Sequence, residues 1–444
     1  MNTSTKHPPR LSGTHQEGNL SVAHAPFTPS SDALRVKEKV DGITKRVGDF
    51  IVEMEMSKRK FILEQQIALA CEQSGINYLT PLGIDISTTH DVNIPNKQWV
   101  PAIVLTVKHG HTEITKLLLA HPDIQVNQPD FNGDTALMIA VKSNYIEATQ
   151  MLLAHPDILV NHKNSNGDTA LMLAALHGKV EIFGLMLSHP DIQINQVNHE
   201  NETALMWAVG GGHTEITKLL LAHPGILVNH PNSKGNTALM YAANSYGQTE
   251  TSTELLLAHP DILVNHLNFT WDSALMLAVL HGNETIIELL LAHPDILVNQ
   301  WGDKGNTALI LAAKFWQVVS TMILLEHPDI LVNQGNDYGI TPLMLAASMG
   351  DISITQRLLA HPDILVNQSD CKGETALICA AKNSQIDTIE LLLADSRLIP
   401  EEHDQWKIAI DVKRKITLSS SPKNKAIDEV EKLLNKIGNW INRI

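Results

Sequence analysis

The sequence predicts an all-α solenoid built from short helix-turn-helix units that are joined by extended turns. A fixed period is the first reason: HPDI or a near copy begins at eight histidines, spaced 34, 34, 34, 36, 34, 34 and 34 residues apart. Self-similarity at such a period is the signature of a repeat architecture. The second reason is composition, because aromatic residues make up only 4% of the 444 residues. That content suits the packing of small-residue helices.

Each unit contains the signals of two helices. Thr169 precedes ALMLAAL and is expected to cap the first helix with its hydroxyl group, and Gly178 ends that helix. The second helix, VEIFGLML, carries apolar residues three and four apart. It ends at His-Pro, because a residue before proline is pushed out of the α region. Threonines at the same place in the other units are Thr135, Thr203, Thr237, Thr307, Thr341 and Thr375, and glycines in the Gly178 slot are Gly110 and Gly282.

The segment TPLMLAASMGDISITQRLLAHPDILVN, from Thr341 to Asn367, resembles the ankyrin repeat. The resemblance lies in the TPL helix start, the AA pair, the glycine turn, the apolar second helix and the VN segment. It implies a solenoid that binds another protein with its concave face. Ala replaces the family's Pro except at Pro342, and Met or Ile replaces its His, so apolar packing is expected in place of a His hydrogen-bond network. The nine units are placed at 97–128, 129–162, 163–196, 197–230, 231–266, 267–300, 301–334, 335–368 and 369–400.

The flanks of the array differ from it. We expect a disordered tail at 1–33, a helical segment at 34–96, the array at 97–400 and a helical cap at 401–444. Near the N-terminus, apolar residues recur three and four apart, which predicts one long helix or two; they are Val36, Val40, Ile43, Val47, Phe50 and Met54. The C-terminal stripe from Ile427 to Ile444 has a seven-residue period and fits a cap, a coiled-coil or partner helix, or a membrane-surface helix. The N-terminal helix has the same alternatives.

Composition and motifs argue against several classes of function. A net charge of -15 speaks against sequence-independent nucleic-acid binding. The three cysteines lack any CxxC spacing, which favours a reducing, cytoplasmic location. The sequence shows no secretory signal and no apolar run long enough for a transmembrane helix. His-Pro-Asp occurs at the repeat period, unlike the single motif of a J-domain. Neighbouring repeats bring at most two such histidines to one metal ion. We therefore expect no enzyme, no cofactor and no metal site.

Ankyrin proteins usually bind partners through the positions after the turn Asp or Asn and those after the AA pair. The resemblance therefore implies a protein-binding surface on units six to eight. Three tryptophans add to it: Trp271 stands where six other units have Gly, Trp316 replaces the Gly that ends the first helix, and Trp301 precedes a turn. Packing against neighbouring turns is the alternative for these rings. The other residues of the predicted surface are Phe269, Thr270, Leu280, Lys304, Lys314, Phe315, Tyr338 and Met349.

The sequence thus predicts an intracellular scaffold or adaptor, expected as a monomer, whose partner is an unidentified protein. Two alternatives stay open. One is a bacterial effector that is delivered into a host cell and recruits a host protein, which the near-identical units fit as a product of recent duplication. The other is the substrate-recruiting module of an enzyme.

Overall fold

The computed structural model describes residues 31–73, 92–93, 95, 99–245 and 249–398. The predictions for the C-terminal segment 401–444 and for residues 1–30 of the tail lie outside the described residues. The chain divides into two compact units, 1–63 and 64–444. Within the described ranges there is no β-strand, and one isolated bridge joins Ser369 to Thr375. The all-α prediction is confirmed.

The N-terminal apolar periodicity forms a single helix, α1 (Ser31–Gln73), of 43 residues. It begins inside the stretch that was expected to be a disordered tail, so Ser31, Asp32 and Ala33 are helical. From Glu64 onward the helix belongs to the same compact unit as the repeats. There Ile67 is fully buried, and Oε1 of Glu64 lies 3.8 Å from Nε2 of His121. The last turns of α1 therefore contact the first repeat.

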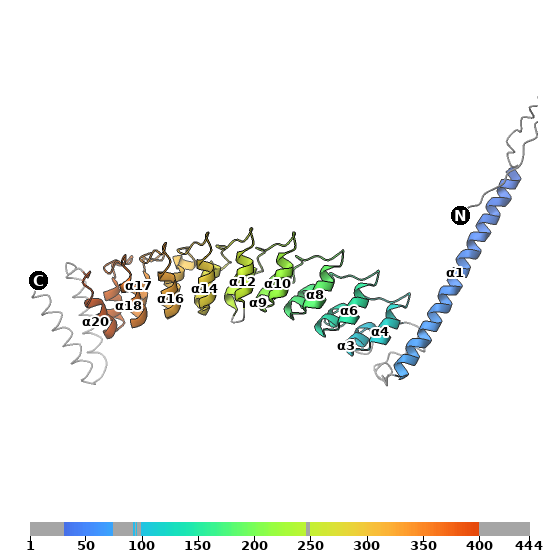
Figure 1. Ribbon diagram of the computed structural model, residues 1–444, viewed down its shortest axis with the longest axis horizontal. Helices are drawn as coiled ribbons and strands as arrows, with labels where there is room; N and C mark the ends of the chain where they lie inside the picture. The colour runs from blue at the N-terminus through green and yellow to red at the C-terminus, as the bar shows by residue number, and fades with distance from the viewer. Residues whose placement is uncertain (1–30, 74–91, 94, 96–98, 246–248, 399–444) are drawn as a thin grey trace, which may run out of the picture. The chain divides into compact units, whose positions relative to one another are not determined.

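In the described part of the second compact unit, nine pairs of short helices follow one another in a single row (Figure 1). The first helices are α3 (Ala102–Lys108), α5 (Ala136–Lys142), α7 (Ala170–Leu176), α9 (Ala204–Gly210), α11 (Ala238–Asn244), α13 (Ala274–His281), α15 (Ala308–Lys314), α17 (Pro342–Met349) and α19 (Ala376–Lys382). The second helices are α4 (Thr112–Leu119), α6 (Ile146–Leu153), α8 (Val180–Leu187), α10 (Thr214–Leu221), α12 (Glu250–Leu257), α14 (Glu284–Leu291), α16 (Val318–Leu325), α18 (Ile352–Ala360) and α20 (Ile386–Leu393). A short 3-10 turn, η1 (Asp303–Gly305), precedes α15.

The first helices begin as the threonine pattern predicts. The hydroxyl of Thr169 accepts a hydrogen bond from the N–H of Met172, and six of the seven threonines named above cap in this way. Thr237 is the exception, because its side chain makes no capping bond. In unit six the cap is Ser273, whose Oγ accepts from the N–H of Met276.

The shared core is apolar and made largely of small or flexible side chains. Alanines of the first helices are buried throughout the array, which lets neighbouring helices approach closely. Methionines fill the slot where the family has histidine, and they are buried at Met138, Met172, Met206, Met240, Met276 and Met344. Among the residues with described side chains, Phe183 is the one large aromatic ring in the core, and it is fully buried in α8. The expected apolar replacement of the His network is confirmed.

The repeated histidine is a turn residue that follows the second helix of each of the first eight units. In the second unit, α6 ends at Leu153 and Ala154 is its C-cap, so His155 lies beyond the helix. Its Nδ1 accepts a hydrogen bond from the N–H of Asp157 at 3.2 Å. All eight copies make this bond, which requires an unprotonated Nδ1. The motif is therefore a structural turn.

A ladder of asparagine side chains joins each unit to the next. In Asn265, Nδ2 donates to the carbonyl of Asp295 at 2.7 Å, and Oδ1 accepts from the N–H of Leu297 at 2.9 Å. The same pair of bonds is made by Asn93, Asn127, Asn161, Asn195, Asn229, Asn299 and Asn333. The VN segment of the repeat thus supplies hydrogen bonds between repeats as well as a buried valine.

Candidate protein-binding surface

The structure sorts the predicted surface residues into two rows at opposite ends of the first helices. The tip row lies in the turns that precede these helices and comprises Phe269, Thr270, Trp271, Trp301, Lys304 and Tyr338. The helix-end row lies where the same helices end and comprises Leu280, Lys314, Phe315, Trp316 and Met349. A first helix of seven residues, at 1.5 Å per residue, separates the rows by about 10 Å. The residues thus form two parallel lines on units six to eight.

The aromatic side chains of both rows are exposed. This holds in the tip row for Phe269, Trp271, Trp301 and Tyr338, and in the helix-end row for Phe315 and Trp316. The Nζ of Lys314 lies 5.3 Å from the centroid of the Phe315 ring, a cation–π contact between neighbours. Leu280 and Met349 are half-buried and lie in the same row. Large exposed rings on consecutive repeats are the residue types that anchor protein interfaces.

Trp271 has a left-handed backbone conformation that its slot imposes. Its φ is 64°, and the glycines in the same slot, such as Gly167 at 81° and Gly235 at 80°, lie in the same region. A bulky residue there costs on the order of 1–3 kcal/mol, because its Cβ crowds the backbone. The ring is nevertheless 62% exposed, so burial returns little of that cost.

The turn that follows Trp271 is remodelled. Seven turns carry an Asn or Asp whose Oδ1 accepts two backbone N–H bonds, as Asn268 does from Thr270 and Asp272. The seventh unit has Gly302 at this place. A Cβ on Gly302 would lie 2.8 Å from the carbonyl oxygen of Trp271, so a side chain does not fit there.

Backbone hydrogen bonds join the turn tips of adjacent units, and this series is interrupted between units six and seven. Phe269 N–H donates to the carbonyl of Lys234, and equivalent bonds start at Ser165, His199, Ser233, Asp337 and Cys371. Between units six and seven, whose tips are fully described, no such bond is present. The exposed tryptophan and the interruption coincide, so the tips of units six and seven each have one such bond, to units five and eight respectively.

Trp316 is the second tryptophan in a glycine slot. Its φ is 57°, close to the 64° of Gly178 and the 63° of Gly282, and its ring is 61% exposed. Asn144 takes the same slot in the second unit with φ 59°. Trp271 and Trp316 therefore both have the positive φ that glycine has at these positions in other units.

Sequence reasoning missed a third tryptophan of this kind. Trp99 stands in the turn slot of the first unit, with φ 60° and 76% exposure. The available signal was its distance from the helix start, since Trp99 lies two residues before the N-cap Pro101 just as Trp271 lies two before Ser273. A second signal was the sequence from Asn96 to Trp99, which has the same Asn-x-x-Trp pattern as Asn268 to Trp271.

Trp207 and Tyr241 are half-buried, and both donate hydrogen bonds to Glu202. The Glu202 carboxylate accepts hydrogen bonds from Tyr241 Oη, from Trp207 Nε1 at 3.0 Å and from Asn198 Nδ2 at 3.0 Å. Burial pushes the pKa of Glu202 up, but these bonds outweigh it and leave the pKa below its usual value. Burial, and then the carboxylate, raise the pKa of Tyr241. The cluster joins units four and five.

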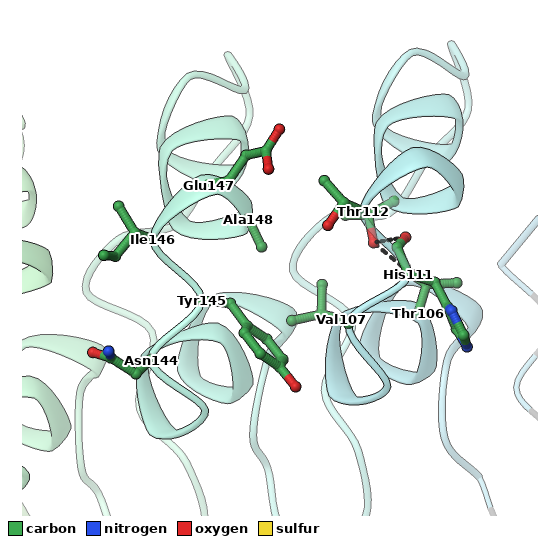
Figure 2. Close-up of a pocket in the computed structure, with 11 residues that line it drawn as sticks. Thr106, Val107, His111, Thr112, Asn144, Tyr145, Ile146, Glu147 and Ala148 are labelled. Atoms are coloured by element: carbon green, nitrogen blue, oxygen red, sulfur yellow. Dashed lines mark hydrogen bonds between the residues drawn. The ribbon is translucent and has the colours of Figure 1, made fainter.

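A surface pocket of about 280 Å³ lies between the first two units (Figure 2). The turns between α3 and α4 and between α5 and α6 line it, with Tyr145 on one side and His111 on the other. Thr115 Oγ1 already donates to Thr106 Oγ1 and lies 3.0 Å from the His111 carbonyl oxygen. The pKa of His111 is lowered by burial and by nearby His109. Glu147 is the one acidic residue in the lining.

Metal-binding and thiol chemistry find no support among the described residues. No group of three His, Cys, Asp or Glu side chains is placed there to hold a metal ion. Cys371 is exposed in a turn, as expected. Burial raises the pKa of the Cys379 thiol to about 11, so that group is protonated at neutral pH. None of the described helices combines the length and apolar character that a membrane crossing requires.

Comparison with known proteins agrees with the geometry. The family model for ankyrin repeats (3 copies) matches residues 67–164, 103–198, 155–226, 192–268, 247–334 and 317–400, which together span 67–400. The chain belongs to the ankyrin-repeat family, whose repeats are protein–protein interaction modules. No curated protein matches the sequence. Among solved structures, the human ASB11 ankyrin repeat domain is 24% identical, with a TM-score of 0.43, covering 51% of this chain and 98% of its own.

Proposed function

We propose that the array is a protein-binding scaffold or adaptor, and that its partner binds across the tip row and the helix-end row of units six to eight. The observation that carries the proposal is Trp271. A residue that costs backbone energy and buries little of its ring contributes little to the free fold, whereas a partner that covers the ring gains apolar burial.

The neighbouring features support the same place. Trp316 repeats the arrangement in the helix-end row of the next unit, and Phe315 and Lys314 lie beside it. The interrupted tip hydrogen bond leaves the turn of unit six able to adjust to a partner. An open row of turns fits a macromolecule better than a small ligand, which prefers an enclosed cleft.

The test begins with the full chain as bait in a lysate of the cells that express it, followed by measurement of the affinity of each captured protein. Trp271→Asn and Trp316→Asn are the informative variants, because Asn201 and Asn144 already occupy these two slots with φ 58° and 59°. Each variant is expected to raise the Kd about 30-fold, which corresponds to about 2 kcal/mol for an interface anchor.

Trp99→Asn is the matched control, since Trp99 has the same backbone conformation and greater exposure but lies in the first unit. It is expected to leave the affinity unchanged. A captured partner that binds Trp271→Asn and Trp316→Asn as tightly as the wild type places the binding surface elsewhere on the array. Loss of affinity in Trp99→Asn alone moves it to the first unit.

We further propose an intracellular role without catalysis. The cysteine usage supports the location, and membership of the ankyrin-repeat family, whose repeats are interaction modules, supports the absence of catalysis. Delivery into a host cell or recruitment of substrates for an enzyme would use the same surface, and the identity of the captured partner distinguishes these roles.

A further inference from the structure

The part of α1 in the first compact unit exposes a line of large apolar side chains. Val47, Phe50, Met54 and Phe61 are all exposed, although each is of a type that packs in cores. They recur three, four and seven residues apart and therefore lie along one side of the helix. A helix that leaves such a line in water has an apolar surface that remains to be covered.

The spacing of this line is that of a coiled coil. With position a at residues 40, 47, 54 and 61 and position d at 36, 43, 50 and 57, every core position but Ser57 is apolar. The pattern holds for nearly four heptads between Val36 and Phe61, and a strict seven-residue repeat maintained over that length favours supercoiling with another helix. The next d position is Glu64, which is buried in the second compact unit, so the frame ends where the helix joins the repeats.

The charges beside the line are matched for a second copy in the same direction. In a parallel pair, position g of one helix faces position e of the next heptad in its partner, which sets Glu53 against Lys58 on both sides. Arg46 would face Ile51 and Lys60 would face Gln65, so no like charges meet in this register. Position g faces position g in an antiparallel pair, where the repulsion between Lys39 and Lys60 would offset the attraction between Arg46 and Glu53.

We propose that residues 36–61 of α1 bind the same segment of a second copy of this chain, forming a parallel two-stranded coiled coil. Val40 and Val47 at position a are the β-branched residues that favour two strands there. The dimer replaces the monomer expected from the sequence. Self-association through α1 is independent of what the array binds, so failure of the proposed binding surface leaves it intact.

The test is the mass of the full chain in solution, measured by light scattering during size exclusion over a dilution series. The wild type is expected to have the mass of two chains. Phe50→Lys inserts two charges into a core layer and is expected to weaken the dimer more than about 100-fold, giving the mass of one chain. Val52→Lys is the matched control, because Val52 is 57% exposed against 60% for Phe50 but lies at position f, facing away from the seam. It is expected to remain dimeric.

A wild-type chain with the mass of one copy at every concentration overturns the proposal, including when the exposed face binds lipid vesicles or another protein instead. A mass of three chains overturns the two-stranded form. Equal effects of Phe50→Lys and Val52→Lys overturn the assignment of the seam.

Orientation is tested by charge reversal. Glu53→Lys alone and Lys58→Glu alone are each expected to raise the dimer Kd about fivefold, because each turns two attractive pairs into repulsive ones. The double variant is expected to restore the wild-type Kd, since the pairs reform with their charges exchanged. Failure of the double variant to restore it excludes the parallel arrangement.

Discussion

The asparagine ladder makes the coupling between repeats measurable at Asn265. Asn265→Ala removes the bond from Nδ2 to the Asp295 carbonyl, at 2.7 Å, and the bond from the Leu297 N–H to Oδ1, at 2.9 Å. Each intramolecular hydrogen bond contributes about 0.5–1.5 kcal/mol net of its exchange with water. Both bonds lie near solvent, so water replaces them in part, and we expect a loss of about 1–2 kcal/mol of unfolding free energy.

The assay is equilibrium unfolding in urea followed by far-ultraviolet circular dichroism. In a repeat array, a weakened interface between units five and six lowers the free energy of the transition and also its cooperativity. The midpoint is therefore expected to fall together with the slope. Asn265→Asp should lower the unfolding free energy at least as much as Asn265→Ala does. The aspartate keeps the acceptor for the Leu297 N–H but sets an oxygen against the Asp295 carbonyl oxygen.

Leu297→Ala is the control for this series. The Leu297 side chain is exposed while its N–H takes part in the ladder, so removal of the side chain is expected to change the stability by less than about 0.5 kcal/mol. The reasoning is refuted if Asn265→Asp unfolds at the wild-type urea concentration, since the donor bond would then contribute nothing.

Two further predictions concern the interior and the pH dependence of the array. Phe183→Ala should lower the unfolding free energy by about 3–5 kcal/mol, because the ring is fully buried. Urea unfolding measures this loss, and Phe131→Ala, at an exposed position, is the control. Glu202→Gln should cost about 1 kcal/mol near pH 7, where the carboxylate accepts bonds from Tyr241 and Trp207. Because the folded pKa of Glu202 is lowered, that stabilisation is fully present above the unfolded pKa and is lost as the pH falls through the folded pKa. The difference between wild type and variant should therefore shrink as the pH drops from about 5 toward 3, and a difference that is constant with pH would contradict the assigned role of the carboxylate.

The local elements followed from the sequence because their causes are local. A capping hydroxyl such as that of Thr169, a glycine such as Gly178 and a residue placed before proline each act within one turn of the chain. Exact repetition then implied the stacking, since one helix pair cannot bury its apolar face alone. The candidate surface residues were reached through the family resemblance and the aromatic residues in glycine slots, and their role as a binding surface remains a prediction.

Contacts between units were decided only by the tertiary structure. The absence of a side chain at Gly302 is explained by the carbonyl of Trp271, which lies 31 positions away in the sequence. The apolar line from Val47 to Phe61 is visible in the sequence, whereas the exposure of its side chains is known only from the structure. A sequence pattern states which side of an element is apolar, whereas what covers that side depends on contacts between residues far apart in the chain.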